Sequence, residues 1–200
     1  MKHICTLIYF FCILSCGKND DNDPKHYNFN SNDYLYIPTG YKDIGKVFTF
    51  KNDLNEKIEL KVVSYDMSIE KGGGVGESKP VHTYDQLIIK LKVIENNSDC
   101  DSKTIKITKW GGSLITRISS KASSIPCADI LTFEKFEYPY PFNSMSFDDQ
   151  SYDKVVTIFK DSKPYFSPNY EFNNTHFDFK NGFIGFDDDN MNVKFRLIKE

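Results

Sequence analysis

The chain has 200 residues, with 25 basic and 28 acidic side chains and a formal net charge of −3. No segment is rich in lysine and arginine, so we expect no nucleic acid partner, because such partners are held through basic stripes. The length is sufficient for one domain with a hydrophobic core, and a second independent core is not expected.

The chain begins MKHICTLIYFFCILSC, which has the organisation of a secretory signal. Its apolar run, residues 4–14, covers roughly 16 Å as a helix, about half of a ~30 Å hydrocarbon core, and is therefore too short to span a membrane. The ending Ile13-Leu14-Ser15-Cys16 resembles the lipobox of bacterial lipoproteins, in which a peptidase cuts before the cysteine. The resemblance implies that residues 1–15 are a signal peptide and that Cys16 carries the lipid.

Residues 16–33 are expected to comprise the lipidated cysteine and a disordered acidic tether, because their polar composition cannot bury enough surface to fold. An acidic tether is repelled by anionic lipids, so attachment to the membrane is expected through acyl chains on Cys16 alone. The stretch that contains Lys18, Asp20 and Asp21 resembles the export signal of surface-exposed Bacteroidota lipoproteins. This implies an outer-membrane protein that faces the cell surface. A plain spacer that leaves the domain facing the periplasm is the alternative.

From residue 34 to residue 200 the hydrophobicity alternates with a period of two, which predicts a single all-β domain. In residues 57–69 the alternation shifts by one position after Val62, which predicts a β-bulge or a strand that changes face. In residues 81–93 the positions from Leu87 onward give one apolar and one basic face, as in a half-buried strand.

The remaining predicted strands are residues 47–51, 103–110, 113–119, 131–138, 152–160, 175–180, 183–186 and 192–199. Gly111-Gly112 and Asn181-Gly182 predict two-residue hairpin turns, and residues 187–190 a polar tip between the last two strands. Short helical turns are expected only in residues 120–129 and 169–174. About nine or ten antiparallel strands predict a barrel-like or strongly curved sheet, with a sandwich as the alternative.

The order of these segments resembles a group of uncharacterised Bacteroidota lipoproteins. The residues that carry the resemblance are Tyr36-Ile37-Pro38, Gly45–Phe50, Ile58–Val62, Tyr152–Val155, Phe177–Phe179, Gly182–Phe186 and Phe195–Ile198. The chain departs from the family pattern at Val47, where tryptophan is common. The resemblance implies a lipid-anchored β domain and implies no activity.

The mature chain keeps two further cysteines, Cys100 and Cys127. In an oxidising compartment this pair predicts a disulfide, which would stabilise the domain by about 3.6 kcal/mol in the chain-entropy model. Two free buried thiols are the alternative. No C-x-x-C pair or third ligand accompanies them, so we expect no metal and no cofactor.

The residue types used in catalysis are scattered along the chain, and there is no Gly-x-Ser-x-Gly elbow. His82 and His176 lie on predicted strands beside aromatic residues and are interpreted as half-exposed strand residues. Asp178 follows His176 by two positions on the same strand face, which predicts a local pair. Residues 187–192 offer several oxygens without the spacing of a calcium loop and are interpreted as a solvated turn.

Aromatic residues are abundant, with 12 Tyr, 17 Phe and 1 Trp. Tyr138, Tyr140 and Phe142 surround two prolines, and rigid exposed aromatic side chains of this kind are typical of surfaces that bind glycans or proteins. Packing at the open end of a barrel is the alternative. The leading hypothesis is a non-enzymatic binding module. The alternatives are a hydrolase whose carboxylates converge only in the fold, and an immunity-type lipoprotein that blocks a foreign enzyme or toxin.

Overall fold

A computed structural model describes residues 24–73, 82–94, 102–121, 132–137, 141–147, 149–159, 173–188 and 192–198. This part of the chain forms twelve β-strands and two short 3-10 helices, which confirms the predicted all-β class. The strands are β1 (Lys25–Tyr27), β2 (Val47–Lys51), β3 (Lys57–Gly72), β4 (His82–Val93), β5 (Ser102–Trp110), β6 (Ser113–Lys121), β7 (Thr132–Glu137), β8 (Asn143–Phe147), β9 (Gln150–Phe159), β10 (Asn174–Asp178), β11 (Gly182–Asp188) and β12 (Val193–Leu197). The helices are η1 (Asp33–Tyr36) and η2 (Thr39–Lys42).

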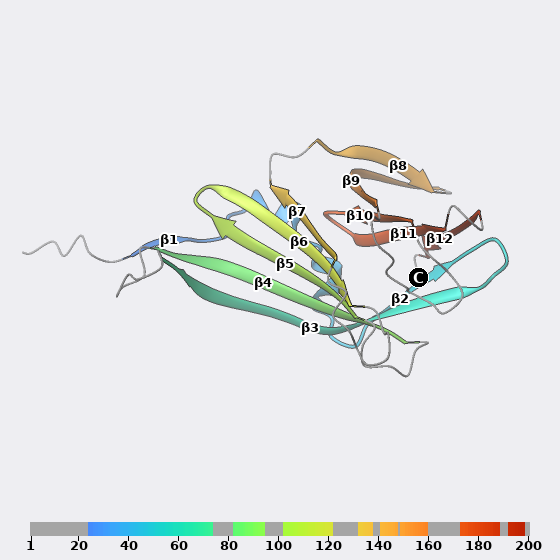
Figure 1. Cartoon of the computed structure of the whole chain (residues 1–200), viewed down its shortest axis with the longest axis horizontal. Coiled ribbons are helices and arrows are strands. Elements are labelled where there is room, and N and C mark those ends of the chain that lie inside the picture. Colours follow the sequence, from blue (N-terminus) through green and yellow to red (C-terminus); the bar gives the residue numbers. More distant parts are fainter. Residues whose placement is uncertain are drawn as a thin grey trace, which may run out of the picture.

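All twelve strands belong to one sheet, along which the strand order is β7-β6-β5-β4-β3-β2-β12-β11-β10-β9-β8. Every pair along this path is antiparallel, and β1 adds in parallel to β4. The sheet curves strongly without closing, since β7 and β8 lie at its two ends (Figure 1). A curved single sheet was one of the two predicted forms, and the sandwich alternative is not the form observed.

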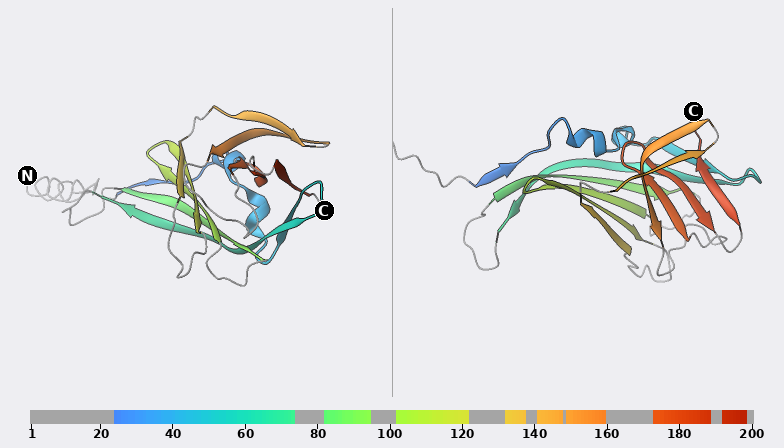
Figure 2. Two further views of the ribbon diagram at one scale, coloured as in Figure 1. Left: turned by 45° about the vertical axis from the view of Figure 1, so that its right-hand side comes forward. Right: turned by 90° about the horizontal axis from the view of Figure 1, so that it is seen from above.

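The core fills the inside of this curve. The N-terminal segment with η1 and η2 lies there, between the two halves of the sheet (Figure 2). Tyr41 of η2 is completely buried, and its hydroxyl accepts a hydrogen bond from the backbone N–H of Phe183 at 2.8 Å. Fully buried side chains that surround it or continue the core along the sheet are Ile37, Phe50, Leu60, Leu87, Ile89, Phe177, Phe186 and Phe195.

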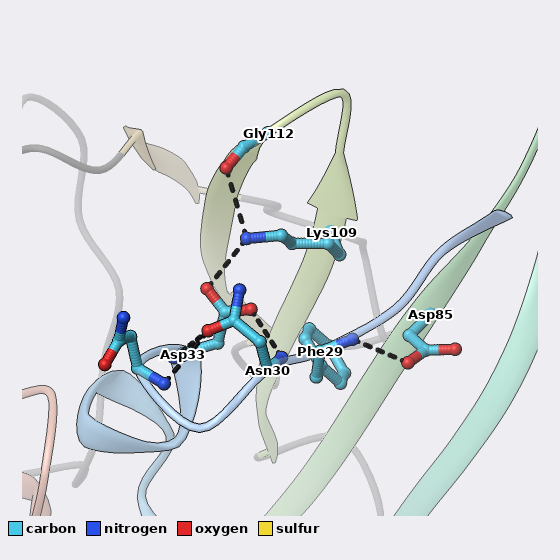
Figure 3. A network of polar contacts seen from close by, with 7 residues as sticks. Phe29, Asn30, Asp33, Asp85, Lys109 and Gly112 are labelled. Atoms are coloured by element: carbon cyan, nitrogen blue, oxygen red, sulfur yellow. Dashed lines mark hydrogen bonds and ion pairs between the residues drawn. The ribbon is translucent and has the colours of Figure 1, made fainter. Parts of the chain in front are cut away.

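The packed domain begins within residues 16–33, the segment predicted to be a disordered tether. β1 pairs with β4, and the backbone N–H of Phe29 donates to Asp85 at 2.7 Å. Asp33 is buried and forms an ion pair of 2.9 Å with Lys109 of β5 (Figure 3). Composition misses this docking, because the polar groups of the segment are satisfied by partners on β4 and β5 instead of by water.

Ten strands were predicted, and each corresponds to an observed strand with somewhat different ends. The predicted irregularity of residues 57–69 is confirmed as a register shift between Val62 and Ser64, which keeps the apolar side chains of β3 on the core face. The Gly111-Gly112 hairpin is also confirmed, since Trp110 pairs with Ser113. The two additional strands, β1 and β8, have three and five residues and carry no clear hydrophobic alternation.

The predicted Asn181-Gly182 turn is wrong in its position. β10 ends at Asp178, which pairs with Gly182, so residues 179–181 form the connection. The Asp178 carboxylate accepts hydrogen bonds from the backbone N–H groups of Lys180 and Asn181 at 3.0 and 2.8 Å. These bonds close the turn two residues earlier than the sequence pattern indicates.

Candidate functional site

The face of the sheet that points away from the core carries a hollow of about 360 Å³ across β4, β5, β6 and β7. The alternation of β5 explains its lining, because Lys106 and Trp110 occupy positions of the same parity while Ile107 between them is completely buried in the core. We call this site the outer-face hollow. It is lined by Tyr84, Lys106, Thr108, Trp110, Ile115, Arg117 and Glu137.

One end of the outer-face hollow is aromatic. The Trp110 side chain is 45% exposed, and its ring lies edge-on to His82 at 4.4 Å and to Tyr84 at 5.3 Å between centroids. His82 in turn packs against Tyr27 of β1 at 5.9 Å, and its Nε2 atom is buried without a hydrogen-bond partner. These neighbours hold the tryptophan in place while leaving nearly half of it accessible, which lowers the entropy cost of binding a ligand against it.

The other end of the outer-face hollow is cationic. Lys106 on β5 stands directly opposite Arg117 on β6, and Arg117 stands opposite Lys135 on β7. Like charges at directly opposed positions destabilise an antiparallel pair. Within the part of the chain that the structure describes, neither Lys106 nor Arg117 forms an ion pair. The described lining thus carries two cations, Lys106 and Arg117, and one carboxylate, Glu137, and its excess positive charge provides a position for an anion.

A second polar cluster lies on the outer side of β9 to β12. His176 is buried, and its Nε2 atom donates to Asp187 at 2.8 Å, while its Nδ1 atom lies 3.1 Å from the hydroxyl of Thr157. Arg196 pairs with the second oxygen of the same carboxylate. Phe147 of β8 lies 4.3 Å from the guanidinium of Arg196 and covers the cluster from outside.

This cluster corrects two predictions. His176 pairs with Asp187 and not with Asp178, whose carboxylate instead accepts hydrogen bonds from the backbone N–H groups of Lys180 and Asn181. Asp187 and Asp188 are buried strand residues and not part of a solvated turn. Burial by itself would raise the pKa of Asp187, but the hydrogen bonds and charges of His176 and Arg196 hold this pKa below its usual range.

The residue types Thr157, His176 and Asp187 occur in the order nucleophile, base and orienting acid. The histidine, however, is 4% exposed, and its carboxylate partner is shared with Arg196, which fixes both groups. We therefore interpret the cluster as a structural network. Among the described residues, no three histidine, cysteine, aspartate or glutamate side chains are grouped as metal ligands.

Of the aromatic residues predicted to bind a ligand, Phe142 is described, and it packs against the core. Its ring stacks on Tyr36 at 5.7 Å and meets Phe179 edge-on at 5.2 Å. This position favours the alternative interpretation, in which the ring closes the core. The other predicted site residues lie outside the described ranges: Cys16, Lys18, Asp20, Asp21, Cys100, Cys127, Tyr138 and Tyr140.

The sequence reasoning missed Lys106, Trp110 and Arg117. A signal for them exists, because Lys106 and Trp110 lie on the same face of a predicted strand that ends at the Gly111-Gly112 turn. Folding that hairpin around the turn places Arg117 opposite Lys106. A search for charges at opposed hairpin positions would have found the pair.

No protein-family model matches the chain, and neither a curated protein nor a solved structure does. The described residues contain no helix that is long and apolar enough to cross a membrane.

Proposed function

We propose that the protein is a lipid-anchored lipoprotein of the outer membrane, exposed at the cell surface, which binds an acidic glycan in the outer-face hollow and catalyses no reaction. One observation carries the ligand assignment: an exposed, braced tryptophan lines the same hollow as two directly opposed cations that form no ion pair within the described part of the chain.

The chemistry of the two ends complements an acidic sugar. The apolar face of a pyranose ring packs against Trp110, as sugars commonly do on exposed aromatic rings. A carboxylate or sulfate group then reaches Arg117, whose planar guanidinium donates two parallel hydrogen bonds to such a group. Binding relieves the repulsion between Lys106 and Arg117 and therefore favours an anionic ligand over a neutral one.

The anchor rests on the N-terminal sequence. The basic start, the short apolar run and the lipobox-like ending before Cys16 support lipidation, and the acidic residues that follow support export to the surface. Because the packed domain begins at β1, the free tether of this proposal comprises only the residues between Cys16 and Lys25. No observation among the described residues favours the hydrolase or the immunity-type alternative.

Calorimetric titration of the full-length protein in detergent micelles with heparin, polygalacturonate and neutral dextran tests the ligand class. We expect binding to at least one acidic polymer and no binding to dextran. Arg117→Glu should weaken that binding at least tenfold, equivalent to about 1.4 kcal/mol, because it removes the bidentate donor and reverses its charge.

Lys57→Glu is the matched control, since it makes the same change in charge at an exposed position at the start of β3, outside the hollow. It should leave the affinity within twofold of wild type. Trp110→Ala should weaken binding without changing the net charge. Equal losses of affinity for Arg117→Glu and Lys57→Glu would show non-specific attraction and would contradict the proposed site. Binding to neither acidic polymer would contradict it as well.

A further inference from the structure

Strand β3 has an open edge over more than half of its length. β2 pairs with it only from Lys57 to Lys61, whereas the pairing with β4 continues to Gly72. In Figure 1 this part of β3 forms the lower margin of the sheet. Within the described part of the chain, no strand pairs with residues 63–72 on their free side.

The core-facing side of this edge is apolar and accessible. Met67 and Ile69 are 53% and 65% exposed, and Tyr65 on the same face is half-buried. Unpaired edges normally carry proline or charged side chains at such positions, which block the addition of another strand. Residues 63–72 contain no proline, and the three positions Tyr65, Met67 and Ile69 carry no charge.

We propose that two copies of the chain associate through this edge, with β3 antiparallel to β3 of the second copy and Met67 facing Met67 at the two-fold axis. A two-fold axis perpendicular to the sheet keeps the core-facing side chains of both copies on one face. The opposed pairs in this register are Val63 with Lys71, Ser64 with Glu70, Tyr65 with Ile69, Asp66 with Ser68, and Met67 with itself.

The charges of the edge disfavour the two registers next to this one. With Met67 at the centre, no two like charges stand opposite each other, and the apolar residues Tyr65 and Ile69 meet. Moving the centre to Asp66 places that carboxylate opposite its own copy, and moving it to Ser68 places Asp66 opposite Glu70. Directly opposed like charges destabilise a strand pair, so both neighbouring registers are disfavoured. This self-complementarity is the reason for assigning a second copy as the occupant.

Cysteine cross-linking of the full-length protein in intact cells tests the proposal. Opposed residues in an antiparallel pair have Cα atoms about 4.5–5.5 Å apart, within the range that a disulfide bridges. Met67→Cys should therefore give a covalent species of twice the mass of the chain on a non-reducing gel after mild oxidation. The wild type and a Leu54→Cys control should give at most a tenth of this cross-linked species. Leu54 lies in the β2–β3 turn and is 74% exposed.

A second substitution separates pairing from chance collision. Ile69→Lys in the Met67→Cys chain places a charge opposite Tyr65 and should reduce the cross-linked species at least fivefold. Leu54→Lys in the same chain should leave it unchanged, and circular dichroism should show the same sheet content for both. Absence of the cross-linked dimer, or a cross-linked product of another mass, would overturn the proposal, the latter by showing that a different chain occupies the edge.

Discussion

At the scale of single residues, Asp187 is the point where the charges of the C-terminal strands converge. Its two oxygens accept hydrogen bonds from His176 and Arg196, and both of these side chains pack against Phe147. The hydroxyl of Thr157 adds a contact to the far nitrogen of the imidazole ring. These contacts hold β9, β10, β11 and β12 together on the side of the sheet opposite the core, where apolar packing is thinner.

The stabilisation that Asp187 provides depends on pH in a defined direction. Its pKa in the folded protein is below the usual range, and in the unfolded chain it is about 3.9. The contribution is therefore fully present above about pH 4 and is lost as the pH falls through the lower, folded-state pKa. We expect Asp187→Asn to reduce the free energy of unfolding by about 1–3 kcal/mol at pH 7.

Urea denaturation of wild type and Asp187→Asn at pH 7 and at pH 3 measures this effect. The difference between the two proteins should shrink at pH 3. Asp66→Asn, which neutralises an exposed carboxylate on β3, should change stability by no more than about 0.5 kcal/mol at pH 7. A difference for Asp187→Asn that stays constant or grows on acidification would refute the assigned role.

At the scale of elements, the β10–β11 hairpin packs closely against η2 at one glycine. Gly182 has a φ of +89°, and a Cβ atom built on it would lie 2.2 Å from the hydroxyl oxygen of Tyr41. Tyr41 has no room to withdraw, because it is completely buried and its hydroxyl binds the N–H of Phe183. Both the backbone conformation and the steric contact thus require glycine at this position.

Gly182→Ala should consequently destabilise the protein by about 2–4 kcal/mol, the sum of backbone strain and overpacking. Gly111→Ala separates the two effects, since Gly111 also has a positive φ of +64° but nothing within 4 Å of the added atom. It should cost only about 1–2 kcal/mol, from the backbone strain alone. Thermal unfolding followed by circular dichroism compares the two variants. Equal losses of stability in the two variants would show that Tyr41 moves aside without an energetic cost.

The elements that could be predicted from the sequence are those in which apolar and polar side chains alternate over many residues. β4 and the irregular β3 follow from side-chain periodicity, and the β5–β6 hairpin from its two glycines. The docking of the N-terminal segment depends on partners far away in the sequence, such as Asp33 with Lys109, and no local pattern announces it. The same holds for His176, whose partner Asp187 lies on the neighbouring strand, two positions from Gly185, which stands opposite His176.

At the scale of the whole molecule, the candidate site depends on how the charges are distributed over the sheet and not on the net charge of the chain. The chain has a net charge of −3, and on that basis no basic surface was predicted. The sheet nevertheless brings Lys106, Arg117 and Lys135 from three strands into one row. The candidate site therefore could not be read from composition, because it arises from register, and register is set only when the hairpins form.

The most direct test of the central claim uses intact cells that express the full-length protein. Fluorescent labelling of these cells with heparin or polygalacturonate reports both surface exposure and ligand binding. We expect wild-type cells and Lys57→Glu cells to be labelled equally, and Arg117→Glu cells, with the same amount of protein in the outer membrane, to be labelled at least tenfold less. Labelling of Arg117→Glu cells at the wild-type level would contradict the account.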